Sequence, residues 1–262
     1  MNKMLAEIDR RTEAWRNAME PHGAAAQEDF DERMNVSWIY HDNAMEGLVL
    51  TYHELNAAVD ESIISASTLI PAYDNIVHQK RAIELVRQAA AKRKPPLGLE
   101  ILKKIHLTVT VEVKPRSAKI IPKPPGQYRK DNPLHRLYFH EIAPPEKISY
   151  QMRKLVQWFG SDEARHLHPV KRAAYAHHKL IGIFPWPKNS GKVSRLLMNL
   201  ILLREGYLPA IIHAMERQNY YERLRQSPDE LAELVARGLL STLEAAERYA
   251  EAVGQEAVRA AS

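Results

Sequence analysis

The 262-residue chain contains no cysteine, which excludes disulfide bonds and catalysis by a thiol. The apolar segment LLMNLILL at 196–203 is far shorter than the roughly twenty residues that a membrane-spanning helix needs. The N-terminal segment MNKMLAEIDRRTEAW is charged and lacks the apolar core of a signal peptide. We therefore expect a cytoplasmic protein with no membrane partner.

Spaced metal-ligand motifs such as HExxH are also absent from the sequence, so we predict no structural metal site. The formal net charge is +5, and the basic residues are spread along the chain. This balance is compatible with a phosphate-bearing ligand. The sequence contains no arginine-rich run or aromatic-basic motif, which argues against a nucleic-acid partner.

Helical periodicity dominates the sequence. Gly47 suits the left-handed end of a helix, and Thr51 with Glu54 forms a capping box at the start of the next one. Breaks are expected at 21–26 and in the proline-rich segment 113–130. Capping boxes at Ser227–Glu230 and Ser241–Glu244 predict two terminal helices. The other predicted helices cover 3–20, 27–45, 51–66, 72–91, 98–109, 169–182 and 192–204.

One segment, HRLYFHEIAPP at 135–145, has strand character. Its shortness, imperfect alternation and flanking prolines predict a small edge hairpin. The predicted fold class is therefore all-α with one small β-hairpin.

The segment FPWPKNSGKVSR at 184–195 is the main candidate for a binding site. It precedes a helix that is apolar nearly all round, as buried central helices are. A helix N-terminus exposes unpaired N–H groups and a partial positive charge, so this loop could bind a phosphate. The alternative is a solvated helix start flanked by lysines. The candidate anion-binding residues are Lys188, Asn189, Ser190, Gly191, Lys192 and Arg195.

The same segment, with the following LLMNLILLREGYLPAII, resembles the core of Fic (Fido) domains, whose motif is HPFx(D/E)GNGRxxR. HDNAMEGLVLTYHEL at 41–55 is similar to the family's inhibitory motif (S/T)xxxE(G/N) with the LT that follows it, and GQYRK at 126–130 to its GeYR segment. YFHEIAPPEKISYQMRKLVQWF and RQNYYERL resemble the flap region and the segment after the core. The resemblance implies N-terminal helices at 1–95 with the inhibitory-like motif at 42–47, a Fic core at 96–226, and C-terminal helices at 227–262.

The resemblance implies an α-helical fold and, for many members, transfer of AMP from ATP to a hydroxyl side chain of a target protein. Two chemical positions differ here. Phe184 stands at the position of the catalytic histidine, and Lys188 at that of the acidic Mg²⁺ ligand. A phenyl ring accepts no proton, and a cation opposes a metal. ATP or another nucleotide stays a candidate ligand, whereas Mg²⁺ is not expected. Asn189, Ser190 and Lys192 also depart from the motif, while Pro185, Gly191 and Arg195 match it.

The regulatory residues of the resemblance are Glu46 and Gly47. In the family the motif glutamate reaches the second motif arginine, here Arg195, and blocks productive placement of the ATP γ-phosphate. Asp42 stands where the family has Ser or Thr. The alternative is that Glu46 and Arg195 form only a structural ion pair.

Tyr138, Phe139 and His140 correspond to the flap, where a target protein would dock by β-augmentation. A homodimer is a second candidate assembly. His135, His140, His177 and His178 are candidate replacement bases, but histidines at such places are more often structural. Trp186 is interpreted as a core residue.

Three functions remain open from the sequence. The first is a Fic-fold protein with a degenerate motif, without standard AMP transfer, that binds a nucleotide, another phosphate-bearing ligand or a partner protein in a regulatory role. The second is an active nucleotidyl- or phosphotransferase with a non-standard mechanism. The third is an interaction module without a small-molecule ligand.

Overall fold

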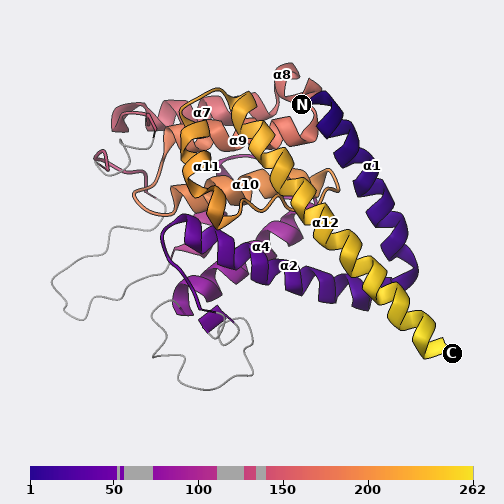
Figure 1. Cartoon of the computed structure of the whole chain (residues 1–262). Coiled ribbons are helices and arrows are strands. Elements are labelled where there is room, and N and C mark those ends of the chain that lie inside the picture. The colour runs from indigo at the N-terminus through magenta and orange to yellow at the C-terminus, as the bar shows by residue number, and fades with distance from the viewer. Residues whose placement is uncertain (52–53, 56–72, 111–126, 134–139, 262) are drawn as a thin grey trace.

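The computed structural model describes residues 1–51, 54–55, 73–110, 127–133 and 140–261, and these residues contain helices and no strand. The all-α fold class is therefore confirmed (Figure 1). The helices are α1 (Asn2–Met19), α2 (Gly23–Met45), α4 (Tyr73–Ala91), α5 (Leu99–Val109), α7 (Ile148–Phe159), α8 (Asp162–His166), α9 (Pro169–Ile183), α10 (Ser190–Arg204), α11 (Arg217–Leu224) and α12 (Pro228–Ala261), with 3₁₀ turns at Glu20–His22, Pro145–Lys147 and Ala214–Glu216.

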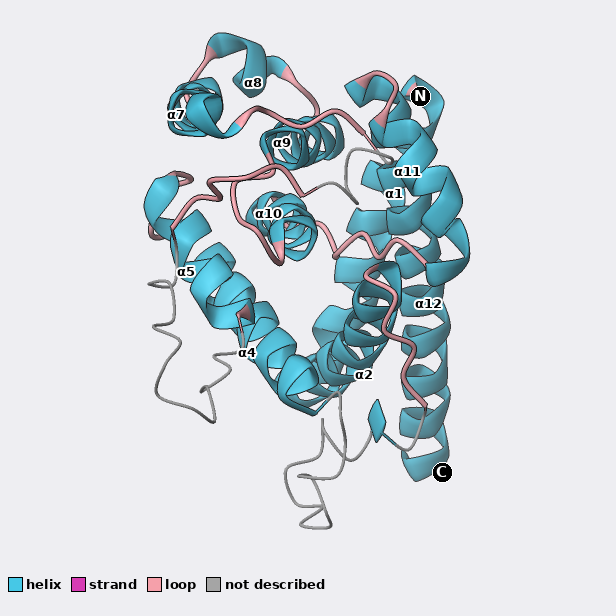
Figure 2. Cartoon of the chain, turned by 90° about the vertical axis from the view of Figure 1, so that its left-hand side faces the viewer, coloured by secondary structure: helices cyan, strands magenta, loops and turns pink. Residues whose placement is uncertain are grey.

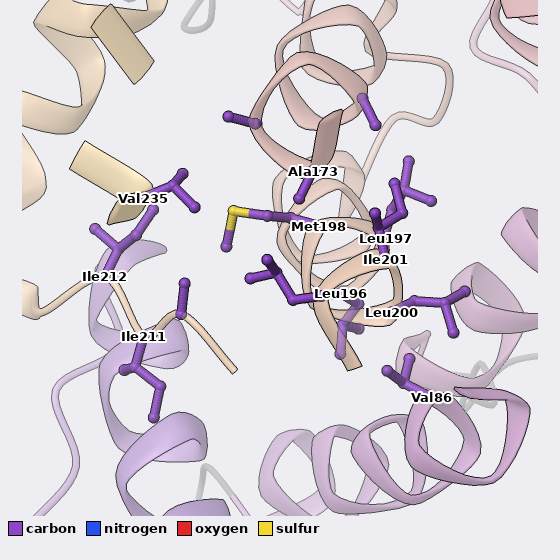
Figure 3. Packing of buried hydrophobic residues seen from close by; sticks show 14 of the residues in the cluster. Val86, Ala173, Leu196, Leu197, Met198, Leu200, Ile201, Ile211, Ile212 and Val235 are labelled. Carbon is purple, nitrogen blue, oxygen red and sulfur yellow. The ribbon is translucent and has the colours of Figure 1, made fainter. Parts of the chain in front are cut away.

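Helix α10 lies at the centre of the molecule, as its apolar sequence predicts. Every residue from Ser190 to Leu202 is buried. In Figure 2, α10 is surrounded by α9, α4 with α5, and α2 with α12. Figure 3 shows Leu196, Leu200 and neighbouring α10 side chains between Val86 of α4 and Ala173 of α9. Because α10 is buried on all sides, its first turn lies in the interior of the protein. This turn is the second half of the candidate segment 184–195.

The C-terminal region is one long helix rather than two, so that prediction is wrong. Helix α12 runs from Pro228 to Ala261 and packs against α1 and α9 (Figure 1). Its buried stripe continues through Leu239, Leu243 and Ala246, past the second predicted start. The Thr242 hydroxyl donates to the carbonyl of Gly238 at 3.1 Å, a bond made within a continuous helix. The packing of the stripe outweighs the local capping pattern.

The N-terminal break is shorter than predicted. Helix α1 ends at Met19, a single 3₁₀ turn follows, and α2 begins at Gly23 instead of residue 27. Gly23 has φ 73°, a conformation that glycine adopts without strain. Gly47 has φ 89° just after α2, as its predicted role at the helix end requires.

The capping box at Thr51 forms as predicted. The Glu54 N–H donates to Thr51 Oγ1 at 3.2 Å, and the Thr51 N–H donates to Glu54 Oε2 at 2.8 Å. Most of the predicted helix 51–66, the proline-rich residues 111–126 and the flap residues 134–139 lie outside the described residues. Residues 140–144, which are described, are not a strand, so that half of the predicted hairpin is wrong.

Candidate functional site

The loop between α9 and α10 begins with a buried phenyl ring. Phe184 is 1% exposed and ends α9 in the left-handed conformation, with φ 48° and ψ 61°. Its ring centroid lies 6.4 Å from that of His140. A phenyl ring neither accepts nor donates a proton, so the Phe184 side chain cannot act as a base.

Arg129, from the GQYRK segment, holds the backbone of this loop in place. Its Nε donates to the carbonyl of Phe184 at 2.7 Å, and its Nη2 donates to the carbonyls of Ile183, at 3.3 Å, and Ala143. Its own N–H donates to the carbonyl of Pro185 at 2.9 Å. The bonds to Ile183 and Phe184 occupy carbonyls that the end of α9 leaves without intrahelical partners.

Trp186 is fully buried, which confirms its interpretation as a core residue. Its ring stacks on that of His106 from α5, with centroids 4.4 Å apart and planes 9° from parallel. Burial lowers the pKa of His106 to about 4. The Ser190 hydroxyl accepts from the Trp186 N–H at 3.0 Å and donates to its carbonyl at 2.9 Å. Ser190 therefore closes the turn before α10, and both hydrogen bonds of its hydroxyl are internal.

The two residues before Ser190, Asn189 and Lys188, differ from it in burial. Asn189 adopts φ 64° and donates to the carbonyl of Val109 at 3.3 Å and to the hydroxyl of Thr110 at 3.4 Å. Lys188 is exposed. Lys188 therefore has access to solvent two residues before the first residue of α10.

The first turns of α10 face the last turn of α2 together with Glu46 and Gly47, which follow it. Arg195 is buried and donates through Nε to Asp42 Oδ1 and through Nη2 to Glu46 Oε1 at 2.9 Å. Lys192 is also buried, and its Nζ donates to Asn43 Oδ1 at 2.8 Å. The two motif cations thus point toward α2 and contact its side chains.

The electrostatics of this cluster follow from its burial. Burial alone would lower the pKa of Arg195, but the carboxylates of Asp42 and Glu46 outweigh it and raise that pKa well above its ordinary value. Burial lowers the pKa of Lys192, and the same two carboxylates oppose the shift. Two cations and two carboxylates therefore balance each other at the junction of α2 and α10.

The Glu46 carboxylate lies at the N-terminus of α10. A Cβ atom added to Gly191 would lie 2.5 Å from Glu46 Oε1 and 3.3 Å from Arg195 Nη1. Helix N-termini carry unpaired N–H groups and favour negative charge. The sequence predicts that the anion of a ligand binds at this helix N-terminus. In the structure a carboxylate of the protein itself, that of Glu46, lies there.

The residues at this site do not fit Mg²⁺. The carboxylates of Asp42 and Glu46 at this site pair with Arg195, and Lys188 adds a positive charge to the loop. Magnesium sites need carboxylate oxygens that are free to face the ion. Among the described residues, no group of three or more histidine or acidic side chains could hold a metal ion.

The candidate histidines have structural partners where they are described. His140 Nε2 donates to the carbonyl of Ile181 at 3.1 Å. His177 Nε2 is hydrogen-bonded to the Tyr220 hydroxyl at 3.1 Å, and burial holds the pKa of His177 well below its ordinary value. Burial also lowers the pKa of His178. His135, Tyr138 and Phe139 lie outside the described residues.

The sequence does not predict two of the partners in this cluster. Asp42 stands out in it only as a departure from the resembled motif, and Asn43 has no distinguishing signal. Asp42 and Glu46 are spaced i and i+4, which places both carboxylates on one face of α2. That spacing is a signal in the sequence, although nothing local indicates which cation the face would meet.

Comparisons with known proteins agree with this architecture. The model of the Fic/DOC family matches residues 96–202. A protein adenylyltransferase Fic of Nematostella vectensis is 30% identical over 189 residues, which cover 72% of this chain and 42% of the relative. The protein of the same name from Aedes aegypti is 26% identical over 225 residues, covering 85% of this chain and 42% of the relative. The chain thus spans about two fifths of the length of these relatives.

Solved structures show the same fold. A Fic domain containing signaling protein from Bacteroides thetaiotaomicron superposes with a TM-score of 0.78 at 20% identity, covering 95% of this chain and 98% of the other. Fic-1 from C. elegans superposes with a TM-score of 0.74 at 21% identity, covering 95% and 70%. Among the described residues no helix has the length and apolar character needed to cross a membrane. Residues 96–202 of this chain are therefore a Fic/DOC family domain.

Proposed function

We propose that this protein binds the phosphate groups of a nucleotide at the N-terminus of α10, in competition with its own Glu46 carboxylate, and does not catalyse base-assisted AMP transfer. The observation that carries the proposal is the position of Glu46, whose Oε1 lies within 2.5 Å of where a Cβ of Gly191 would be. ATP is the first nucleotide to consider, because the curated relatives bear the name protein adenylyltransferase.

The proposal excludes standard AMP transfer on chemical grounds. Phe184 is buried at the motif position of the base, and it has no atom that can accept the proton of a target hydroxyl. A general base contributes roughly 10²–10⁴-fold to such a step. Lys188 adds a positive charge where the family motif places a metal ligand. Both losses affect the reacting groups and leave the binding surface of the helix N-terminus in place.

The same residues favour nucleotide binding without a metal. The N–H groups at the start of α10 can bind oxygen atoms of a phosphate once the Glu46 carboxylate moves away. Lys188 is exposed beside them and can neutralise phosphate charge that Mg²⁺ would otherwise balance. Binding would then regulate the contact between α2 and α10, because ligand and Glu46 cannot occupy one position.

Calorimetric titration of ATP into the wild type and the Glu46→Gly variant, with and without Mg²⁺, tests the proposal. We expect saturable binding by the variant, weaker binding by the wild type, and little dependence on Mg²⁺. Adding Lys188→Ala to Glu46→Gly should weaken binding about tenfold, in the range of one charge-assisted contact. The matched lysine control is Lys3→Ala on α1, added to Glu46→Gly, which should leave the affinity for ATP unchanged.

Two results would contradict the proposal. The first is the absence of ATP binding by Glu46→Gly in both conditions, which would favour an interaction module. The second is the consumption of ATP with added mass on a protein, detected by mass spectrometry after incubation with lysate. That result would establish an active transferase.

A further inference from the structure

Arg195 has two carboxylate partners one turn apart, Asp42 in the last turn of α2 and Glu46 directly after the helix. Besides its bond to Glu46, it donates through Nε to Asp42 Oδ1, and its Nη2 lies 3.4 Å from the Asp42 carbonyl oxygen. The Asp42 side chain is 3% exposed, whereas that of Glu46 is 18% exposed. Asp42 is therefore the deeper partner, farther from any ligand that approaches from solvent.

Asp42 is held in place independently of Glu46. Its second carboxylate oxygen accepts a hydrogen bond of 2.5 Å from Gln79 Nε2, and Gln79 is fully buried on α4. Both oxygens of Asp42 therefore have partners, one on α10 and one on α4. The cavity next to Asp42 and Arg195 measures about 10 Å³, which is no larger than a single water molecule needs. The Asp42 carboxylate therefore lies in a closely packed setting with both oxygens hydrogen-bonded.

We infer that Asp42 is a second, independent partner that keeps Arg195 paired when Glu46 is displaced. The inference rests on the proposed function, because it concerns how the same site is regulated. A phosphate can take the place of the half-buried Glu46 carboxylate. Asp42 and Gln79 hold the other side of the guanidinium. A family-type Ser or Thr at position 42 would carry no charge and could not do this.

The consequence is that Arg195 becomes available to a ligand only when the last turn of α2 moves as a unit. Asn43 adds to this coupling, since it binds Lys192 from the same turn. Removing a buried carboxylate partner alone is unfavourable, because it leaves an uncompensated charge in the interior. Glu46 and Asp42 should therefore act together, and their effects on ligand binding should not be additive.

The test compares four proteins: wild type, Glu46→Gly, Asp42→Asn, and the double variant. Each is titrated with ATP in a calorimeter without Mg²⁺. We expect the double variant to bind ATP at least ~10-fold more tightly than Glu46→Gly, within the usual range of coupling between sites. Equal affinities of the double variant and Glu46→Gly would overturn the inference.

A second measurement needs no ligand. The amides of Gly47 and Leu48 donate at 3.0 Å to the carbonyls of Ala44 and Asn43, so their hydrogen exchange reports opening of the α2 turn. We expect fast exchange in the double variant and largely retained protection in Glu46→Gly. Equal exchange in these two proteins would overturn the inference. If none of the four proteins binds ATP, the proposed function fails while this measurement still decides the role of Asp42.

The matched control is Asp31→Asn, also on α2, where Asp31 pairs with Arg87 of α4 at 3.0 Å. It removes one carboxylate from the same helix without touching Arg195, so ATP affinity and exchange at 47–48 should match the wild type. If the double variant does not fold by circular dichroism, Asp42→Ser with Glu46→Gly replaces it and is judged by the same criteria.

Discussion

The Nζ of Lys192 donates a hydrogen bond of 2.8 Å to Oδ1 of Asn43, and both side chains are buried. This contact joins α10 to a residue of α2 that lies 149 positions earlier in the chain. Lys192 is one of the candidate anion-binding residues. In this structure its ammonium group is hydrogen-bonded to another part of the same molecule. The junction of α2 and α10 is a polar cluster inside an apolar core.

Asn43→Ala should lower the free energy of unfolding by about 3 kcal/mol, because it leaves a buried ammonium without that acceptor. Urea denaturation measures the change. The matched control is Asn43→Leu combined with Lys192→Met, which removes both polar groups and should recover most of the loss. A loss below about 0.5 kcal/mol for Asn43→Ala, the size of an ordinary surface change, would show that Lys192 does not depend on this acceptor.

Gly191→Ala should displace the Glu46 carboxylate from the N-terminus of α10 while leaving the backbone unstrained. The added Cβ would meet Glu46 Oε1 at 2.5 Å, so the flexible carboxylate must shift. We expect ATP affinity to rise about tenfold over the wild type, as expected for a modest coupling. In the Glu46→Gly background the same substitution should have no such effect. An equal rise in both backgrounds would mean that the methyl group acts directly on the ligand.

Phe184→His should fold and still not transfer AMP. Histidine tolerates the left-handed conformation observed at φ 48°, and burying its polar ring should cost about 1–3 kcal/mol. Lys188 would still oppose a metal. Transfer of labelled AMP from ATP to protein is the measurement, with Phe184→His plus Lys188→Asp for comparison. Robust transfer by the single variant would show that Lys188 is compatible with catalysis.

Acidification should destabilise the fold between about pH 6.5 and 4. Burial lowers the pKa values of His41 and His106 to about 4, and for His41 the nearby His213 adds to the shift. Both stay neutral in the folded state but bind protons in the unfolded state below pH 6.5, so their contribution is complete above that pH and falls below it.

Melting temperatures of the wild type and His106→Gln, measured from pH 7.5 to 4.5, test this prediction. The variant should lose less stability on acidification than the wild type. His166→Gln, at an exposed position of α8, is the control and should follow the wild type. Parallel curves for wild type and His106→Gln would contradict the assignment to His106.

The sequence predicts the features of this fold that depend on local pattern. The apolar character of 192–204 predicts the buried helix α10, and Gly47 predicts the end of α2, because helix periodicity and left-handed caps are properties of neighbouring residues. The start of α8 also has a local signal in the sequence, a serine at the N-cap position. Ser161 caps it by accepting from the Ala164 N–H at 3.2 Å, although the short helix was not predicted.

The parts that could not be predicted depend on long-range packing. The capping pattern at 241–244 is locally valid, but the stripe through Leu243 and Ala246 packs as one helix. At the candidate site, the loop residues indicate an anion site in general. Their sequence contains no information on Asp42 and Asn43, which determine the direction in which Arg195 and Lys192 point.

The bonds of Arg129 to the carbonyls of Ile183 and Phe184 have a consequence for substitutions at position 184. They hold the main chain of the loop, and a carbonyl oxygen is the same whichever side chain its residue carries. These bonds therefore do not depend on the side chain at position 184, and the backbone anchor of the loop would persist with either a phenyl ring or an imidazole at that position.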